Sequence, residues 1–200
     1  MAEPLFNRFA HVYINTTTEE WLQWASTPEE EYEPLEHEEN IPPAKIHPAI
    51  YSYISYKSIT NDDVLRTPYN GETPNADPRK WEMASKVLYK TNQPHMLRSL
   101  VGEEITADFI AFCSEQVLSV EDVINHTYDE SVFNMNLSEK YATTVGLATV
   151  TEENLETVRD FVTKLGPEIC STFDVVWSRG NEQRLEKIAE LKLESEEMSK

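Results

Sequence analysis

The fold class is decided by one stretch in the first half of the chain, Asp77-Pro78-Arg79-Lys80-Trp81-Glu82-Met83-Ala84-Ser85-Lys86-Val87-Leu88. An aspartate caps a helix well and a proline fits the first helical position, so Asp77-Pro78 predicts a helix start. Trp81, Ala84, Val87 and Leu88 then recur at helical spacing and predict a helix to about Lys90. The whole chain has only five glycines in 200 residues, and its apolar residues recur mostly at this spacing. We therefore expect a predominantly helical protein.

Further helices are expected on both sides of this stretch. The capping-box pattern Thr17-x-x-Glu20 predicts a short helix that ends before Pro28, and His47-Pro48 predicts the start of another. Gly166-Pro167 combines a helix stop signal with a start signal. Other helices are expected near residues 3–9, 94–101, 105–118, 120–126, 138–149, 152–165 and 168–179, the tail past Gly180 carries one weak helical stripe, and the best strand candidate is His11–Ile14.

The charge of the chain is strongly negative. Thirty-six acidic residues against 17 basic ones give a formal net charge of -19, which repels nucleic-acid backbones and anionic lipid. No apolar run approaches the roughly 20 residues that span a bilayer, and the N-terminus lacks a basic and apolar leader. We therefore expect a soluble cytoplasmic protein that binds neither nucleic acid nor membrane.

The chain lacks the common catalytic and metal-binding motifs. It has no G-x-x-x-x-G-K-[ST], G-x-G-x-x-G or G-x-S-x-G sequence. His37-Glu38 begins like the zinc motif H-E-x-x-H, but Ile41 stands at the second histidine position. Cys113 and Cys170 have no CxxC partner, so we expect both to be small core residues rather than ligands. No metal site is predicted.

An acidic segment separates the N-terminal helix from the rest of the chain. Seven glutamates lie between Glu29 and Glu39, and four prolines fall between Pro28 and Pro43. Such a composition offers almost nothing to pack, so it predicts a mobile acidic linker.

Two arginines stand out in a chain where positive charge is scarce, and Arg79 is a candidate phosphate-binding residue. Arg79 lies one residue inside the helix start at Asp77-Pro78, where a cation is unfavourable unless an anion is also present. Unpaired helix amides together with a guanidinium suit a phosphate. Arg8 ends a short amphipathic turn just before the expected strand. Judged by periodicity alone, both arginines are solvated surface residues.

Four short motifs follow one another along the chain: Pro4-Leu5-Phe6-Asn7-Arg8-Phe9, Glu19-Glu20-Trp21-Leu22-Gln23-Trp24-Ala25, His47-Pro48-Ala49-Ile50 and Asp77-Pro78-Arg79-Lys80-Trp81-Glu82. Their order and approximate spacing resemble the C-terminal part of MoxR-like AAA+ ATPases over about residues 3–165. The resemblance implies that Arg8, in the family's (N/D)RF box, is the arginine finger that reaches the γ-phosphate bound by the neighbouring subunit. It implies that Arg79, in the PR-x-W helix start, is the sensor-2 residue that touches phosphates bound by its own subunit.

The resemblance also implies how the chain is organised. A mainly α fold is expected, in which a helical lid domain at residues 46–179 follows a short remnant of the AAA+ α/β core, one helix and one strand, at residues 1–26. Residues 27–45 form the linker and residues 180–200 a charged tail. The family's phosphate-binding loop, magnesium-binding strand and sensor-1 residue have no counterpart here. We therefore expect part of a longer ATPase, or one half of an ATPase divided over two polypeptides.

The function implied by the resemblance is to supply Arg8 and Arg79 to ATP hydrolysis that drives remodelling of a protein substrate by a ring of subunits. ATP and Mg²⁺ would bind only together with the missing ATPase core, so the chain alone is not expected to be an active enzyme. The alternative, from a different class, is a non-catalytic acidic helical module for protein–protein interaction, in which both arginines are surface residues.

Overall fold

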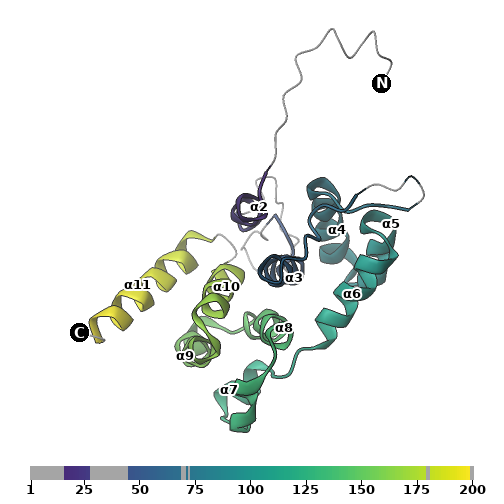
Figure 1. Cartoon of the computed structure of the whole chain (residues 1–200). Helices are drawn as coiled ribbons and strands as arrows, with labels where there is room; N and C mark the ends of the chain where they lie inside the picture. The colour runs from purple at the N-terminus through teal and green to yellow at the C-terminus, as the bar shows by residue number, and fades with distance from the viewer. Residues whose placement is uncertain (1–15, 28–44, 69–70, 72, 179–180, 199–200) are drawn as a thin grey trace.

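A computed structural model shows a chain built from α-helices and short 3₁₀ helices (Figure 1). The structure describes residues 16–27, 45–68, 71, 73–178 and 181–198, and this part of the chain contains no strand. The mainly α fold class is therefore confirmed for these residues. The expected helix at 3–9, the expected strand His11–Ile14, the acidic segment 28–43 and Arg8 lie outside the described residues.

The helices follow one another with short connections. In chain order they are α2 (Thr18–Ala25), α3 (Pro48–Ile59), α4 (Pro78–Thr91), η1 (Pro94–Leu97), α5 (Arg98–Val101), α6 (Glu103–Ser114), α7 (Val120–Ile124), η2 (Glu130–Asn134), α8 (Leu137–Leu147), η3 (Glu152–Asn154), α9 (Leu155–Leu165), α10 (Pro167–Ser178) and α11 (Glu182–Met198).

The residues predicted from the sequence to begin helices do cap those helices in the structure. Thr17 and Glu20 form the expected capping box, in which the Glu20 amide donates to Thr17 Oγ1 over 3.1 Å and the Thr17 amide donates to Glu20 Oε2 over 2.8 Å. Asp77 caps α4, and the Nδ1 atom of His47 accepts from the Ala49 amide at the start of α3. Gly166, with φ at 136°, ends α9 in a conformation that favours glycine.

Two boundaries of α6 differ from the expected range 105–118. The helix begins at Glu103 because Gly102, with φ at 95°, turns the chain directly from α5 into α6. It ends at Ser114, and beyond it the Val117 amide donates to Thr143 Oγ1 over 3.0 Å. This hydrogen bond to α8 leads the backbone away from the helix axis.

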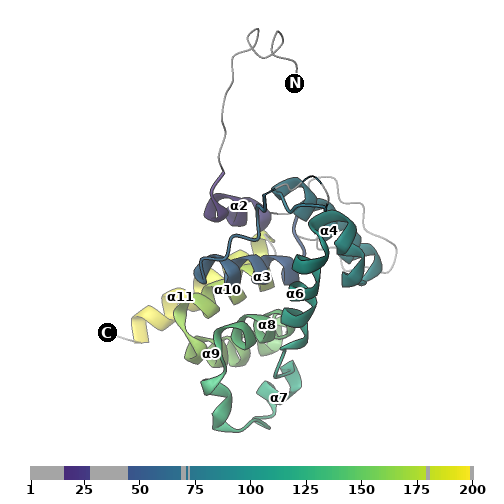
Figure 2. The same ribbon diagram turned by 45° about the vertical axis from the view of Figure 1, so that its right-hand side comes forward.

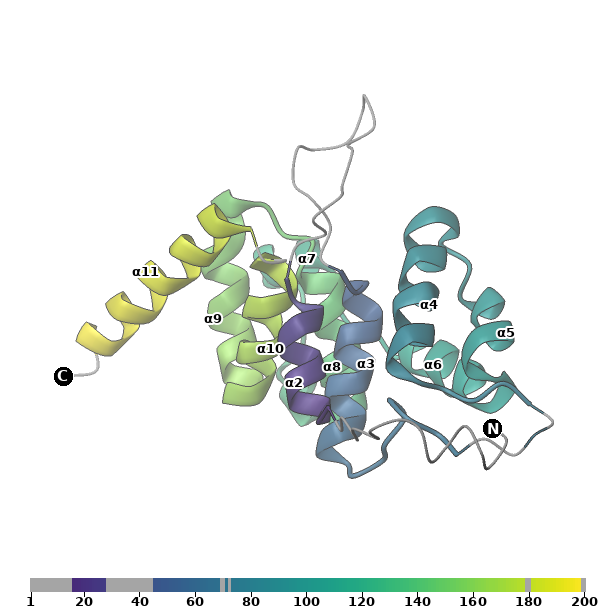
Figure 3. The same ribbon diagram turned by 90° about the horizontal axis from the view of Figure 1, so that it is seen from above.

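The centre of the molecule is formed by α3, α8 and α10, which pack against one another. On one side α2 lies on α3, while α9 and α11 pack on α10. Seen from above, α4, α5 and α6 lie beyond α3, and α11 lies at the opposite edge (Figure 3). Figure 2 shows α7 at the lower end of the molecule, below α8 and α9.

One hydrophobic core runs through the described helices. Its largest fully buried side chains are Trp81, Trp177, Tyr53, Tyr141, Phe109 and Phe173. Trp21 of α2 and Ile188 and Leu191 of α11 belong to the same cluster. The N-terminal helix and the C-terminal helix are thus packed onto the body formed by the helices between them, whereas the division of the chain at residues 27–45 and 180 stays a prediction.

The predicted apolar stripes of α9 and α10 are confirmed, since Leu155, Val158, Val162 and Leu165 are buried, as are Ile169, Phe173, Val176 and Trp177. Of the two cysteines, Cys170 is buried as expected, but the prediction for Cys113 was wrong. Phe112 points into the core, and the following position on a helix is rotated by about 100° toward solvent. None of the described helices is long and apolar enough to cross a membrane.

Candidate functional site

The segment that leads into Arg79 is held by several hydrogen bonds. Thr67 and Ala76 are paired: the Thr67 amide donates to the Ala76 carbonyl, and the Ala76 amide donates to Thr67 Oγ1 over 2.7 Å. One turn into the helix, Lys80 Nζ donates to the carbonyl and the side-chain oxygen of Asn75 over 2.6 and 2.8 Å. These hydrogen bonds fix the backbone of the segment that contains Arg79.

The helix that carries Arg79 is also anchored through its tryptophan. Trp81 is 0% exposed, and its Nε1 donates to the Val64 carbonyl over 2.9 Å. Its ring lies against those of Tyr53 and Phe109, with centroids 6.0 and 6.5 Å apart. The first turn of α4 is therefore set in a fixed orientation relative to α3 and α6.

Arg79 itself is exposed, as its place beside Lys86 and Lys90 on the helix predicts. The structure assigns it no hydrogen bond or ion pair with another described residue. The helix end has an anion of its own, because the carboxylate of Asp77 accepts from the Lys80 amide over 2.9 Å. The guanidinium of Arg79 is thus available to a partner outside the described residues.

The two arginines predicted as site residues are not brought together by the part of the chain that the structure describes. Arg79 is placed at the start of α4, and Arg8 lies outside the described residues. Among those residues there is also no group of three or more histidines, cysteines and acidic side chains that could hold a metal ion. His47 serves instead as the cap of α3, with its ring 4.9 Å from that of Tyr89.

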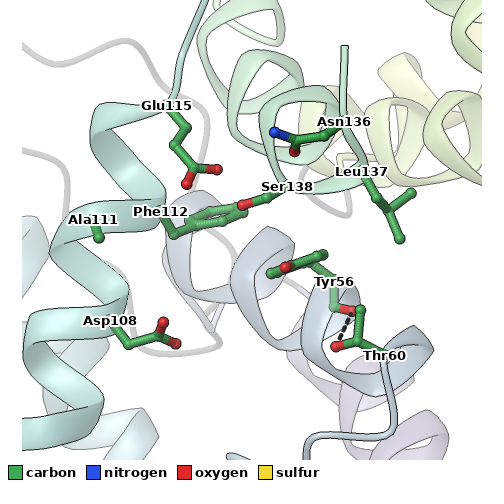
Figure 4. A pocket seen from close by; sticks show the side chains of 9 residues that line it. All are labelled: Tyr56, Thr60, Asp108, Ala111, Phe112, Glu115, Asn136, Leu137 and Ser138. Atoms are coloured by element: carbon green, nitrogen blue, oxygen red, sulfur yellow. Dashed lines mark hydrogen bonds between the residues drawn. The ribbon is translucent and has the colours of Figure 1, made fainter. Parts of the chain in front are cut away.

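The sequence did not predict a cavity of about 370 Å³ between α3, α6 and the start of α8 (Figure 4). Figure 4 shows the side chains of Asp108 of α6 and of Glu115, which directly follows α6, turned toward this space across from Tyr56 of α3. The rings of Tyr56 and Phe112 are stacked, with centroids 5.8 Å apart and planes 15° from parallel. Its lining consists of Tyr56, Thr60, Asp108, Ala111, Phe112, Glu115, Asn136, Leu137 and Ser138.

A charged network supports one wall of this cavity. Tyr53 is buried and donates its hydroxyl to Asp108 Oδ2 over 2.6 Å. Burial raises the pKa of Tyr53 far above its usual range, and the hydrogen bond to the Asp108 carboxylate raises it further. Lys57 Nζ lies 2.7 Å from Asp108 Oδ2 and 2.8 Å from Asp62 Oδ2. Asp108 is thereby fixed in position by α3.

A second cavity, of about 520 Å³, lies between the start of α2 and the loop that follows α3. Its polar lining includes Glu19, Asp62 and Asp63, and its apolar lining includes Ile54, Val64 and Leu65. Lys57 contacts Asp62 in this cavity and Asp108 in the first one. A single lysine thus contacts one lining carboxylate of each cavity.

Comparisons of the chain with protein-family models, with curated proteins and with solved structures gave no match. The resemblance to MoxR-like ATPases consequently rests on the four motifs quoted above.

Proposed function

We propose that this chain is the C-terminal portion of a MoxR-like AAA+ ATPase and that Arg79 binds a nucleotide phosphate from the helical lid domain. The observation that carries the proposal is an exposed arginine on a firmly held first helical turn. A phosphate gains most from a guanidinium whose backbone is fixed beforehand, because little entropy is lost when it binds.

In this proposal the phosphate-binding loop and the magnesium ligands come from the ATPase core, in the same chain or a separate one. The described helices contribute charge and positioning, which is the main protein contribution to phosphoryl transfer. Arg8 would act as the arginine finger on nucleotide bound by a neighbouring subunit of the ring. The work done by the ring would be remodelling of a protein substrate.

The first prediction concerns Arg79 in the ATPase assembled from this chain and its core. Arg79→Ala should weaken ATP affinity as well as turnover, because a lid residue contacts phosphate in the ground state and helps the lid to close. Lys90→Ala removes a charge from the same face at the far end of α4 and should change neither quantity. ATP binding by calorimetry and steady-state hydrolysis test this, and equal effects of the two variants would contradict the role of Arg79.

Arg8 provides an internal comparison in the same assembly. Arg8→Ala should leave ATP binding nearly intact while turnover falls by about 10³-fold or more. Mixing each variant with a subunit that has a dead phosphate loop but an intact finger separates the roles further. Arg8→Ala should regain activity in mixed rings, because the missing finger and the dead loop lie on opposite sides of the same interface and leave an intact site at the other interface. Arg79→Ala should not, because both defects then fall in subunits that bind ATP.

The second candidate function is an acidic helical module that recruits a basic protein. It is favoured by the net charge of -19 and by the carboxylates that face the α3–α6–α8 cavity. A phosphate-loop sequence in the coding region next to this chain would favour the ATPase, and its absence would favour the interaction module.

A further inference from the structure

We propose that the outward face of α4 binds a short acidic segment of a partner protein, and that this segment also carries apolar side chains. The face, called the basic face below, consists of Arg79, Met83, Lys86 and Lys90. Arg79 also belongs to the phosphate site proposed above. The test therefore acts on Lys86 and Lys90, which that site does not use, so that the two proposals can fail separately.

The first observation is the placement of these four residues on the helix. They follow one another at intervals of four, three and four positions, so they fall within an arc of about 60° and span about 16 Å along the axis. All four are exposed, whereas Trp81, on the opposite side of the helix, is fully buried. Because Trp81 holds α4 against α3 and α6, the basic face has a fixed orientation toward solvent.

The second observation is the uneven distribution of charge along the chain. Residues 78–101 contain five of the 17 basic residues but only one of the 36 acidic residues. That acid, Glu82, lies at the edge of the basic face and pairs with Lys86 over 2.9 Å. The three cations of the face thus have one carboxylate beside them on the helix. A positive surface of this kind attracts carboxylates of a partner, although the chain as a whole is strongly negative.

The third observation is the exposed methionine in the middle of the basic face. Met83 is 47% exposed and lies between the cations in the helical arrangement. Met96, in the segment η1 that packs on α4, is 42% exposed. Methionine side chains adapt to surfaces of different shape, and methionine and arginine are enriched at protein interfaces. The partner segment therefore needs apolar side chains among its acidic residues.

The shape and the extent of the basic face favour a peptide over other anions. Neither of the two cavities described above includes a residue of α4, so the face is an open helix surface along which an extended or helical segment can lie. Its length of about 16 Å is about two Debye lengths at physiological salt. A nucleic acid or an anionic membrane extends beyond this length over a chain of net charge -19, which repels it.

The test uses the full chain and the labelled peptide acetyl-Glu-Glu-Leu-Asp-Glu-Phe-Glu-Glu-amide as the probe. A control peptide has glutamine and asparagine in place of the acids. Fluorescence anisotropy should show that the acidic peptide binds at least about tenfold more tightly than the control at about 50 mM salt, and that this advantage is largely lost at about 300 mM salt because exposed charges are screened. In nuclear magnetic resonance spectra the methyl signal of Met83 should shift, whereas that of the buried Met135 should not.

A matched pair of double variants locates the site. Lys86→Glu/Lys90→Glu reverses two charges of the basic face and should weaken binding of the acidic peptide by about tenfold or more. Lys164→Glu/Lys187→Glu makes the same change in net charge at exposed positions on α9 and α11 and should have little effect. Met83→Ser keeps every charge and should also weaken binding, by a smaller factor, because the apolar contact is lost.

Three results would overturn the proposal: no binding of the acidic peptide at millimolar concentration, equal losses in the two double variants, or equally tight binding of a single-stranded oligonucleotide. The acidic segment of this chain is tested separately, by replacing the seven glutamates between Glu29 and Glu39 with glutamine. If the peptide binds only to that variant, the chain's own segment occupies the basic face, and a partner protein does not.

Discussion

A single tyrosine of α3 links the stability of the fold to alkaline pH. Burial raises the pKa of Tyr51 to about 12, and the nearby phenol of Tyr141 contributes in the same direction. In the unfolded chain a tyrosine ionises near pH 10. The folded state therefore favours the neutral phenol, which contributes stability below about pH 10 that is lost as the pH rises toward about 12.

This gives a prediction for Tyr51→Phe, which removes the ionisable group but keeps the ring. The free energy of unfolding of the variant should fall less steeply between about pH 10 and pH 12 than that of the parent chain. Below pH 9 the difference between the two proteins should be constant. Urea unfolding at a series of pH values measures both quantities, and parallel curves above pH 10 would contradict the argument.

Residues that act through local signals were predictable from the sequence. Thr17, Asp77 and Gly166 each determine where a helix begins or ends through contacts with neighbouring backbone. Their roles could therefore be predicted from three or four neighbouring residues. The exposure of Cys113 was not predictable in this way, because it depends on which face of α6 meets α3 and α8. The same holds for the buried oxygen of Glu115.

Among the helices, the start of α6 depends on close contact with another segment. A Cβ atom added at Gly102 would lie 2.8 Å from the Pro74 carbonyl oxygen, and its φ of 95° already disfavours other residues. Gly71 has a similar φ of 85° but no atom within 4 Å of such a Cβ. An alanine at Gly71 would therefore suffer only backbone strain, whereas an alanine at Gly102 would suffer the same strain and a steric clash.

We predict that Gly71→Ala costs only the strain of a positive φ, about 1 kcal/mol, whereas Gly102→Ala costs a further 1–3 kcal/mol or so for the clash. Because the Pro74 carbonyl oxygen belongs to the backbone, it cannot move away as a flexible side chain would. Denaturant midpoints of the two variants measure the difference. Equal destabilisation by the two variants would show that the chain moves the added Cβ atom away from Pro74 at no cost in unfolding free energy.

The two ends of α6 show why its bounds were predicted incorrectly from the sequence. Its cap, Gly102, makes no side-chain hydrogen bond, so no capping residue marks the start. Its end is set by a hydrogen bond from Val117 to Thr143, a residue of a different helix. The start of α4, which is marked by its cap Asp77, was located at the residue predicted, whereas the start of α6 lies two residues before its predicted position.

The arrangement of the whole molecule brings together residues that are far apart in the sequence. The α3–α6–α8 cavity joins Tyr56, Asp108 and Asn136, which no local pattern connects. Apolar patterns in the sequence predicted the helices that form its walls. The cavity itself depends on how these three helices pack together. Arg79 could be singled out from its motif because its role depends on one helix start.

A buried ion pair joins the central helix α10 to α9, which packs on it. Arg159 of α9 donates from Nε to Asp174 Oδ1 over 2.9 Å and from Nη2 to Asp174 Oδ2 over 3.2 Å. Asp174 of α10 is 4% exposed, and Lys192 of α11 reaches its Oδ2 over 3.1 Å. One carboxylate therefore connects three successive helices.

The last prediction follows from the different burial of the two cations. Asp174→Ala leaves the buried charge of Arg159 without its partner and should cost about 3–5 kcal/mol of unfolding free energy. Lys192→Ala, whose side chain is 52% exposed, should cost less than about 1 kcal/mol but loosen α11, seen as faster amide exchange in that helix. The double variant Arg159→Met/Asp174→Leu should recover most of the loss, because it removes both charges and keeps apolar volume. If Asp174→Ala and Lys192→Ala cost the same, the stabilising contact is the one to α11 rather than the one between α9 and α10.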